Sequence, residues 1–307
     1  MKVGVIGAGA VGNASLLSLL LRRSAREIVV VNRNRKKAKA VATDMQYGTP
    51  MFPPVDIHDG DYSDLAGAGV VMIAVGVNEK TGGATDRNDP VGRLGLLEKN
   101  IDIYKEILPQ LIKAAPDAVI LVLTDPPDPL ADFVRQFGFK RVLSSGTFLD
   151  SLRFRFHLGR RLNVDPENVE ALVVGEHGTS EVLLWSSARV SGVPVLRGSE
   201  NEQLRRSIEH EVRFANITII EGNQASQYGI AMAAARIAEI VLRDERSVIP
   251  IGAYNPQYGV TLSLPSIVGK EGLVEILEPE MSDQERQALE RSAETLRAAV
   301  QRIKQAA

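Results

Sequence analysis

Histidine, the amino acid best suited to proton transfer near neutral pH, occurs four times in this chain. His177 lies in a short glycine-flanked segment, Gly175 to Ser180, directly after an apolar run at 171–174. Because imidazole titrates near neutrality, a histidine that such a turn presents to a cleft could exchange a proton with a carbonyl or alcohol oxygen. We predict that His177 is a catalytic acid–base residue. The alternative is a structural place in the turn.

A carboxylate and a guanidinium lie three residues apart, at Asp150 and Arg153, within a segment predicted to be helical. Residues at this spacing share a face of a helix. Asp150 could therefore orient an imidazole, while Arg153 could bind a carboxylate with its planar fork of donors. With His177, this favours a substrate that carries a carboxylate and a reacting oxygen; the alternative is an ordinary surface ion pair.

The glycine-rich hexapeptide Gly7-Ala8-Gly9-Ala10-Val11-Gly12 follows the first predicted strand and opens a predicted helix. In this context Gly7 permits the tight turn, Gly9 lets a pyrophosphate approach the backbone, and Gly12 allows close packing of helix on strand. The amino end of the helix then faces the anion. We predict a dinucleotide site formed by Gly7, Gly9, Ala10, Val11 and Gly12, with Gly76 as a further contact. A nicotinamide there would exchange a hydride with the substrate while His177 exchanges the proton.

The end of the second predicted strand carries Asn32 and Arg33, at the place where an acid usually binds the adenosine ribose. Without that carboxylate a 2′-phosphate is not repelled, and Arg33 could bind it with help from the cations at 35–37. We therefore favour NADP(H) within the class of NAD(P)(H) cofactors. The alternative is that Asn32 bonds an ordinary ribose and that residues 35–37 are a solvated helix start.

Short apolar, β-branched runs alternate with helical patterns in the first half of the chain. The predicted strands are Val3–Ile6, Ile28–Val31, Val70–Ala74, Val119–Leu123 and Arg141–Leu143. Strands that alternate with helices form parallel βαβ units, and continuous apolar runs are buried on both faces. Residues 1–145 are thus predicted to form an α/β dinucleotide-binding domain with a doubly wound parallel sheet of the Rossmann type.

Residues 146–307 show long amphipathic segments separated by short extended stretches. The predicted helices are Asp150–Leu162, Glu200–Glu221, Ala225–Leu242 and Ser282–Ala306. This pattern predicts a second, helix-rich α+β substrate domain, whose last helix begins with a capping box formed by Ser282 and Glu285.

A polar, glycine-rich loop spans residues 76–93 and precedes a helix that we expect to begin near Leu94. Loops of this length are uncommon and serve as functional lids or are disordered. This one follows the carboxyl end of a parallel strand, where ligands bind in open sheets, and that position favours a lid over a surface insertion.

The charges nearly balance, with 36 Lys and Arg against 38 Asp and Glu, which gives no reason to expect nucleic acid or an anionic membrane as a partner. The chain has no cysteine, which excludes a disulfide, a thiolate zinc site and a cysteine nucleophile. No apolar stretch reaches the ~20 residues of a membrane span, and Met1-Lys2 leads directly into a predicted strand without room for a signal peptide. We expect a cytoplasmic protein that binds a small molecule and no metal.

Taken in order, the motifs resemble the lactate/malate dehydrogenase family of L-2-hydroxy-acid dehydrogenases over nearly the whole chain. Besides the glycine hexapeptide, four segments carry the resemblance: 93–100 (RLGLLEKN), 145–155 (SGTFLDSLRFR), 175–178 (GEHG) and 264–269 (LPSIVG). The resemblance implies a homodimer or homotetramer.

The resemblance also implies roles for single residues. His177 would be the acid–base residue, Asp150 its orienting partner, and Arg93 a lid arginine that polarises the substrate carbonyl. Arg153 would bind the substrate carboxylate with two bonds. Ser226 falls where the family lines the pocket for the substrate side chain.

Two positions depart from the family's pattern in the substrate site. Asp125 stands where the family has an asparagine that contacts the substrate. An ionised Asp125 would repel a 2-oxo acid, so it must be protonated, paired with Arg93 or another cation, or matched to a substrate with a positive or donor group. The lid is also longer than in ordinary members, and Arg87 within it is a candidate for substrate discrimination, with a solvated arginine as the alternative.

The sequence therefore predicts an NAD(P)-dependent oxidoreductase that interconverts an L-2-hydroxy acid and its 2-oxo acid. Asp125 motivates the alternative of a non-catalytic dinucleotide-binding regulatory protein on the same fold. A third hypothesis, an NAD-dependent glycosidase on this scaffold, is disfavoured because the chain lacks the cysteine which those enzymes use for metal.

Overall fold

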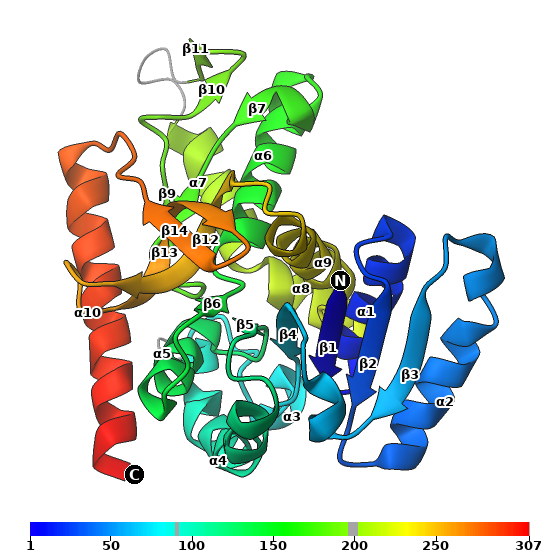
Figure 1. The fold of residues 1–307 in the computed structure, drawn as a ribbon. Coiled ribbons are helices and arrows are strands. Elements are labelled where there is room, and N and C mark those ends of the chain that lie inside the picture. Colours follow the sequence, from blue (N-terminus) through cyan, green and yellow to red (C-terminus); the bar gives the residue numbers. More distant parts are fainter. Residues whose placement is uncertain (90–91, 196–201, 307) are drawn as a thin grey trace.

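The computed structural model describes residues 1–89, 92–195 and 202–306. Six strands of its central sheet are parallel: β1 (Lys2–Ile6), β2 (Glu27–Val31), β3 (Asp56–Gly60), β4 (Val70–Ile73), β5 (Val119–Val122) and β6 (Val142–Ser144). Three antiparallel strands continue it: β12 (Ser247–Asn255), β13 (Val260–Gly269) and β14 (Gly272–Ile276). The nine strands lie in the order β14-β13-β12-β6-β5-β4-β1-β2-β3 (Figure 1). The predicted doubly wound α/β sheet is confirmed.

Helices cover both faces of the parallel part. They are α1 (Ala10–Arg22), α2 (Arg35–Gln46), α4 (Leu97–Ala114), α5 (Pro127–Phe137) and α9 (Tyr228–Leu242). Successive strand residues point to opposite faces, so Val5 packs in one core with Leu16 of α1, while Ile6 packs in the other with Tyr104 of α4. This is why the central strands consist of continuous apolar runs.

The second half of the chain contains four further helices and several short strands. The helices are α6 (Phe148–Leu162), α7 (Glu202–Arg213), α8 (Ala215–Asn223) and α10 (Asp283–Ala306). The short strands are β7 (Val169–Glu170), β8 (Val173–Val174), β9 (Val182–Leu183), β10 (Arg189–Val190) and β11 (Val193–Pro194). The described residues also contain four 3₁₀ turns: η1 (Thr49–Met51), η2 (Tyr62–Leu65), η3 (Gly92–Leu96) and η4 (Pro166–Asn168).

The start of α10 confirms the predicted capping box. The Ser282 amide donates to the Glu285 carboxylate at 2.7 Å, and the Glu285 amide donates to the Ser282 hydroxyl at 3.3 Å. The single helix predicted over 200–221 is wrong, because α7 and α8 are separate helices that meet at Phe214, and residues 200 and 201 lie outside the described residues.

Two parts of the sheet are absent from the sequence-based prediction. Strand β3 has one inward apolar residue, Ile57, and forms the edge of the sheet beside β2. At the other end β12 joins β6 through the pairing of Gly252 with Ser144, where a Cβ on Gly252 would lie 1.8 Å from the serine hydroxyl. The glycine allows the antiparallel strands to extend the parallel sheet.

Helix α9 connects the two halves of the chain. Its residues Ala234, Ala235 and Ile237 are buried in the same core as Val3 and Val5 of β1. The sheet is likewise continuous across residue 145. Because the sheet and this core extend across residue 145, the division into domains 1–145 and 146–307 stays a prediction.

The loop at 76–93 contains a short helix, α3 (Glu79–Gly82), and the first residues of η3; Pro90 and Val91 lie outside the described residues. The helix expected to begin near Leu94 begins as η3 and becomes α4 at Leu97. Two side chains attach the loop to α8 and the residue after it: Arg87 pairs with Glu221, and Lys80 bonds Gln224.

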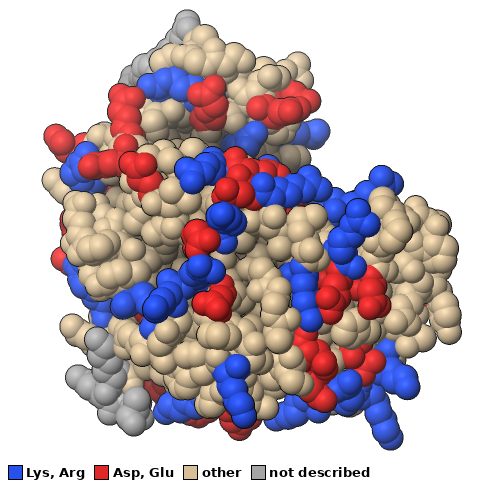
Figure 2. Space-filling model, in the orientation of Figure 1, with Lys and Arg blue, Asp and Glu red and all other residues tan. Residues whose placement is uncertain are grey.

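Charges of both signs are interspersed on the face drawn in Figure 2. Within residues 1–89, 92–195 and 202–306, no helix has the length and apolar character to cross a membrane. The same ranges contain no group of three or more His, Cys, Asp or Glu side chains suited to a metal ion.

Candidate active site

The glycine hexapeptide forms a turn between β1 and α1. Gly7 has a φ of +113°, and a Cβ there would lie 2.7 Å from the Ala74 carbonyl oxygen. A Cβ on Gly12 would lie 1.8 Å from the Gly7 carbonyl oxygen, whereas a Cβ on Gly9 would meet nothing within 4 Å. Gly7 and Gly12 are thus required by packing, and the open space at Gly9 lets a ligand approach the amino end of α1.

A pocket lies between this turn and the second half of the chain. Its lining includes Gly9, Ala10, Val11 and Gly76 on the side of β1 and β4. The exposed helix amino end and the open backbone at Gly9 fit the pyrophosphate of a dinucleotide, because oriented amides stabilise an anion. Gly7 and Gly12 do not line the pocket, but their close packing fixes the turn that does.

Asn32, at the end of β2, bonds the glycine turn itself. Its side-chain oxygen accepts from the Ala8 amide at 3.1 Å, and its amide donates to the Asn34 carbonyl oxygen at 3.1 Å. Arg33 is exposed, and Arg35 pairs with Asp59 of β3 and with Asp61 just after that strand. Part of the positive charge predicted at 35–37 is therefore compensated.

His177 follows β8 after the turn at Gly175, whose φ is +86°. Its Nδ1 lies 2.5 Å from Asp150 Oδ2, and its Nε2 lies 2.5 Å from Arg93 Nη1. An arginine can only donate, so a neutral His177 carries its proton on Nδ1, bonded to Asp150, and accepts at Nε2. Nε2 is the atom on the pocket side, which is the arrangement that a general base requires.

Asp150 lies behind His177 and is 1% exposed. Its other oxygen accepts from Arg153 Nη1 at 2.8 Å. Burial alone would raise the pKa of Asp150, but the charges of His177, Arg153 and Arg93 outweigh it and lower the pKa to about 2. The carboxylate thus stays ionised and fixes the imidazole, and helix α6 provides both Asp150 and Arg153 through their spacing of three residues.

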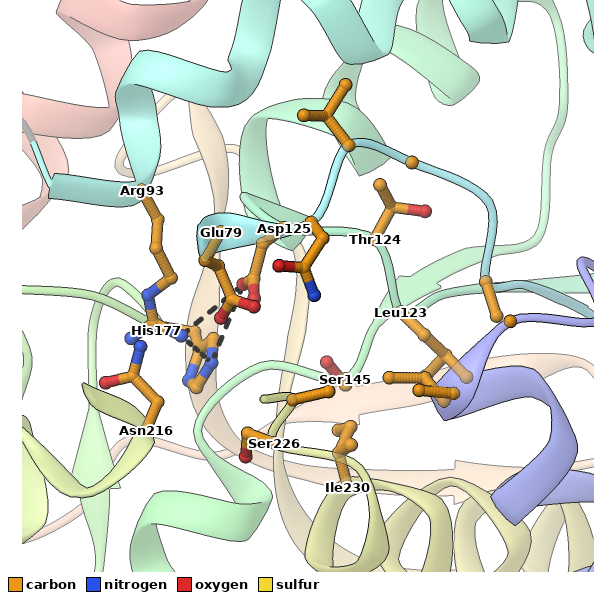
Figure 3. A pocket seen from close by; sticks show the side chains of 18 of the residues that line it. Glu79, Arg93, Leu123, Thr124, Asp125, Ser145, His177, Asn216, Ser226 and Ile230 are labelled. Carbon is orange, nitrogen blue, oxygen red and sulfur yellow. Dashed lines mark hydrogen bonds and ion pairs between the residues drawn. The ribbon is translucent and has the colours of Figure 1, made fainter. Parts of the chain in front are cut away.

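Arg93, in η3, extends over the pocket toward His177 (Figure 3). Its Nη1 lies 3.4 Å from Asp125 Oδ1, which is also 3.9 Å from His177 Nε2. Burial would lower the pKa of Arg93, but the carboxylates of Asp125 and Asp150 more than offset this and raise it. Three alternatives were considered for Asp125: protonation, pairing with a cation such as Arg93, and a substrate with a positive or donor group. The structure shows the pairing with Arg93.

Several residues that position the site were missed by the sequence analysis. Asp128, in the first turn of α5, accepts from the His177 amide at 2.8 Å and from the Ser144 hydroxyl. Asn100 of α4 donates to the Asp125 carbonyl oxygen at 2.6 Å and accepts from the Val77 amide at 2.8 Å. For Asn100, a polar residue within the helix expected to begin near Leu94 is the signal that could have identified it; Asp128 follows two prolines, and no helix was predicted there.

Two further missed residues line the pocket itself. Glu79, the first residue of α3, lies beside Asp125 (Figure 3), and Asn216 of α8 lies near His177. Burial and the charge of Asp125 raise the pKa of Glu79 to about 7, although Arg93 acts in the opposite direction. No local motif marks either residue, because the fold brings them to the pocket from separate helices.

The structure gathers most of the predicted site residues. Arg153, Asp125 and Ser226 line the pocket together with His177 and Arg93. Arg87 lies elsewhere: its guanidinium bonds Glu221 and Thr218 of α8. Because α8 already binds this guanidinium, the structure does not support the prediction that Arg87 contacts the substrate. Arg33 is also not among the residues that line the pocket.

Two family models match nearly the whole chain. The one described as "lactate/malate dehydrogenase, NAD binding domain" matches residues 1–142. The one described as "lactate/malate dehydrogenase, alpha/beta C-terminal domain" matches residues 147–307.

Curated relatives and solved structures agree with these matches. An L-lactate dehydrogenase of Deinococcus radiodurans is 44% identical, with 99% of each chain covered. An L-lactate dehydrogenase of Thermus aquaticus is 42% identical, with 97% of this chain and 98% of the relative covered. The crystal structure of a lactate dehydrogenase from a Medee basin deep-sea metagenome library superposes with a TM-score of 0.89 at 30% identity, covering 98% of both chains.

Proposed function

This chain belongs to the lactate/malate dehydrogenase family, and on that premise we propose that it interconverts an L-2-hydroxy acid and its 2-oxo acid with a nicotinamide cofactor. The observation that carries the proposal is the linked set of Arg153, Asp150, His177 and Arg93 at one pocket. The same pocket reaches the glycine turn of β1. Substrate groups and cofactor are thereby brought to one place.

His177 moves the proton. In reduction of the oxo acid, protonated His177 donates from Nε2 to the carbonyl oxygen while Asp150 stabilises the imidazolium through Nδ1. In oxidation, neutral His177 takes the hydroxyl proton back at Nε2. Arg93 donates to this nitrogen in the structure, so a substrate oxygen must enter between the two side chains and accept from both.

Arg153 and Arg93 bind and polarise the substrate. Arg153 uses one nitrogen on Asp150, and its remaining donors can bind a substrate carboxylate in the planar geometry that guanidinium favours. Arg93 donates to the carbonyl oxygen and stabilises the negative charge that develops there, an effect that is larger where the lid excludes water.

The match of residues 1–142 to a family model described as an NAD binding domain supports a cofactor site at the glycine turn. Gly9, Ala10, Val11 and Gly76 would contact it. When bound, the nicotinamide supplies or accepts the hydride at C2 of the substrate.

We propose in addition that the chain prefers NADP(H). The support is Asn32 in place of an acid, together with the exposed cation of Arg33 next to it. Arg35 contributes less than its charge suggests, because Asp59 and Asp61 pair with it. Arg33 is therefore the residue on which the preference depends.

The same proposal includes a homodimer or homotetramer in the cytoplasm. Helices α1 and α9 pack against each other and expose large apolar side chains: Leu17 is 50% exposed, Leu21 60% and Met232 59%. Phe156 of α6 is 52% exposed. Adjacent apolar side chains on a protein surface mark a contact with another chain.

The function is tested by the absorbance change at the nicotinamide band with a panel of 2-oxo acids, using NADH and NADPH in parallel. We expect turnover, with NADPH the better cofactor. His177→Asn should lower kcat/KM by about 10²–10⁴-fold because the proton donor is lost. Arg153→Gln should raise KM by about a hundredfold because a charge-assisted carboxylate contact is lost.

Cofactor binding, measured by fluorescence, serves as the control and should be unchanged in both variants. Near-normal turnover by either variant would contradict the assigned roles. Cofactor binding without turnover of any 2-oxo acid would instead favour the non-catalytic regulatory protein.

A further inference from the structure

Two carboxyl groups face each other beside the catalytic histidine. Glu79 and Asp125 both line the pocket, from α3 and from the segment after β5 respectively, and Figure 3 shows them side by side above His177. A side-chain hydrogen bond with Asp125 is among the causes that raise the pKa of Glu79, after burial and the charge of Asp125. Neither residue belongs to the linked set of Arg153, Asp150, His177 and Arg93.

Two ionised carboxylates only accept hydrogen bonds, so a bond between them requires a proton. Arg93 contributes one positive charge near the pair and bonds Asp125 at 3.4 Å. The cation adjacent to Glu79 in sequence, Lys80, bonds Gln224 instead. Burial and the neighbouring charge of Asp125 raise the pKa of Glu79 to about 7.

The remaining charged groups around the pocket do not remove the excess negative charge. From α6, Arg153 lines the pocket and is paired with buried Asp150. Burial and the charge of Asp150 raise the pKa of Glu181, which also lies within electrostatic reach of Arg93. His177, beyond β8, bonds Asp150. If Glu79 were ionised, the carboxylates of Glu79, Asp125 and Asp150 would equal the positive charges of Arg93, Arg153 and protonated His177. The carboxylate of the substrate would then leave the site with an excess negative charge.

Asp125 occupies the place where the negative charge of the reaction develops. Its Oδ1 is near both Arg93 Nη1 and His177 Nε2, at 3.4 Å and 3.9 Å. The reacting carbonyl oxygen of a 2-oxo acid must bind between these same two groups. A fully ionised pair would repel that oxygen, whereas a pair that keeps one proton is less negative and can donate a hydrogen bond.

We propose that Glu79 is a positioning residue that shares one proton with Asp125, and that this one-proton form of the pair is the form that accepts a 2-oxo acid. The inference rests on the proposed function and adds a residue to it. The shared proton remains on the pair during turnover, because the hydroxyl proton comes from His177 and the hydride from the cofactor.

The first test compares kcat/KM of the wild type with that of Glu79→Gln across the pH range. The glutamine amide donates to Asp125 without a titrating proton, so its contact is the same at every pH. The ratio of wild type to variant should be constant below about pH 6 and fall about tenfold per pH unit above about pH 7, chiefly through KM.

Asp125→Asn provides the matched variant at the other carboxyl. Above pH 7 the kcat/KM of this variant should fall less steeply than that of the wild type. The ratio of kcat/KM between Asp125→Asn and the double variant with Glu79→Gln should not change tenfold per pH unit. A ratio of wild type to Glu79→Gln that stays constant from about pH 5.5 to about pH 9.5 would overturn the proposal.

The second test needs neither substrate nor cofactor. The infrared band of a protonated carboxyl, taken as the difference between wild type and Glu79→Gln, should be present at pH 6 and disappear with a midpoint near 7; Asp128 and Glu181 cancel in this difference. If the band is absent, the two carboxyl groups do not share a proton. If the band is present but the ratio of kcat/KM between wild type and Glu79→Gln does not depend on pH, the proton has no role in substrate binding. If no 2-oxo acid is turned over, the proposed function fails while this measurement still decides on the proton.

Discussion

At the scale of single residues, Asp128 holds the backbone of His177, the proposed acid–base residue, in place. It is fully buried and accepts from the backbone amide of His177 and the hydroxyl of Ser144. Burial raises the pKa of Asp128 to about 6, although both hydrogen bonds act to lower it. The ionised form is thus disfavoured in the folded state relative to the unfolded chain. Its contribution to stability is greatest at acidic pH and falls as the pH rises through about 4 to 6.

Asp128→Asn should therefore stabilise the protein relative to wild type as the pH rises. The asparagine stays neutral, can accept from the His177 amide and can donate to Ser144. The difference in unfolding free energy between variant and wild type should grow by about 2 kcal/mol between about pH 4.5 and about pH 7.5, measured by urea unfolding. A difference in unfolding free energy that does not depend on pH would contradict the raised pKa of Asp128.

The functional residues that the sequence revealed were those with local motifs. His177 lies in a glycine-flanked turn, and Asp150 and Arg153 share a helix face, so type and spacing indicated their chemistry. Glu79 and Asn216 reach the pocket from α3 and α8 through tertiary packing. No spacing along the chain encodes that approach, which is why these residues could not be predicted.

At the scale of elements, the lid depends on its attachment to α8. Arg87 bonds Glu221 and Thr218, and the loop that contains it ends at Arg93. Arg87→Ala should lower kcat/KM a few-fold for every 2-oxo acid, because a less firmly held lid positions Arg93 less well. Steady-state kinetics across the substrate panel measures this.

Glu221→Gln is the matched control for Arg87→Ala, since it removes the other half of the same pair. The two variants should behave alike, and raised salt should reduce the difference between them and wild type because the pair is exposed. A loss confined to dicarboxylic substrates and to Arg87→Ala would instead indicate that Arg87 contacts the substrate.

The elements were predictable to the extent that hydrophobic patterns dictate them. The central strands β4 and β5 are buried at every residue, so their apolar runs were clear. Strand β3 has the sequence DIHDG and forms through backbone pairing with β2 at the sheet edge. Its side chains carry little apolar signal, and the sequence analysis accordingly missed it.

At the scale of the whole molecule, the apolar surface of α1 and α9 is where we expect a second copy of the chain. Met232→Lys should shift the protein toward monomers in light scattering after size exclusion, because it places a charge in that interface. Met51→Lys is the matched control, since Met51 is 77% exposed in η1, and it should leave the molar mass unchanged. A monomeric wild type, or equal molar masses for Met232→Lys and Met51→Lys, would contradict this interface.

In the proposed reaction a hydride reaches C2 of a 2-oxo acid while His177 supplies the proton. The most direct measurement is to incubate the enzyme with pyruvate and a reduced cofactor deuterated at the transferable position, and to analyse the product by NMR and chiral chromatography. We expect L-lactate with deuterium at C2 from the wild type, and about 10²–10⁴-fold slower formation with His177→Asn. Product of the D configuration, product without deuterium at C2, or equal rates in the two proteins would contradict it.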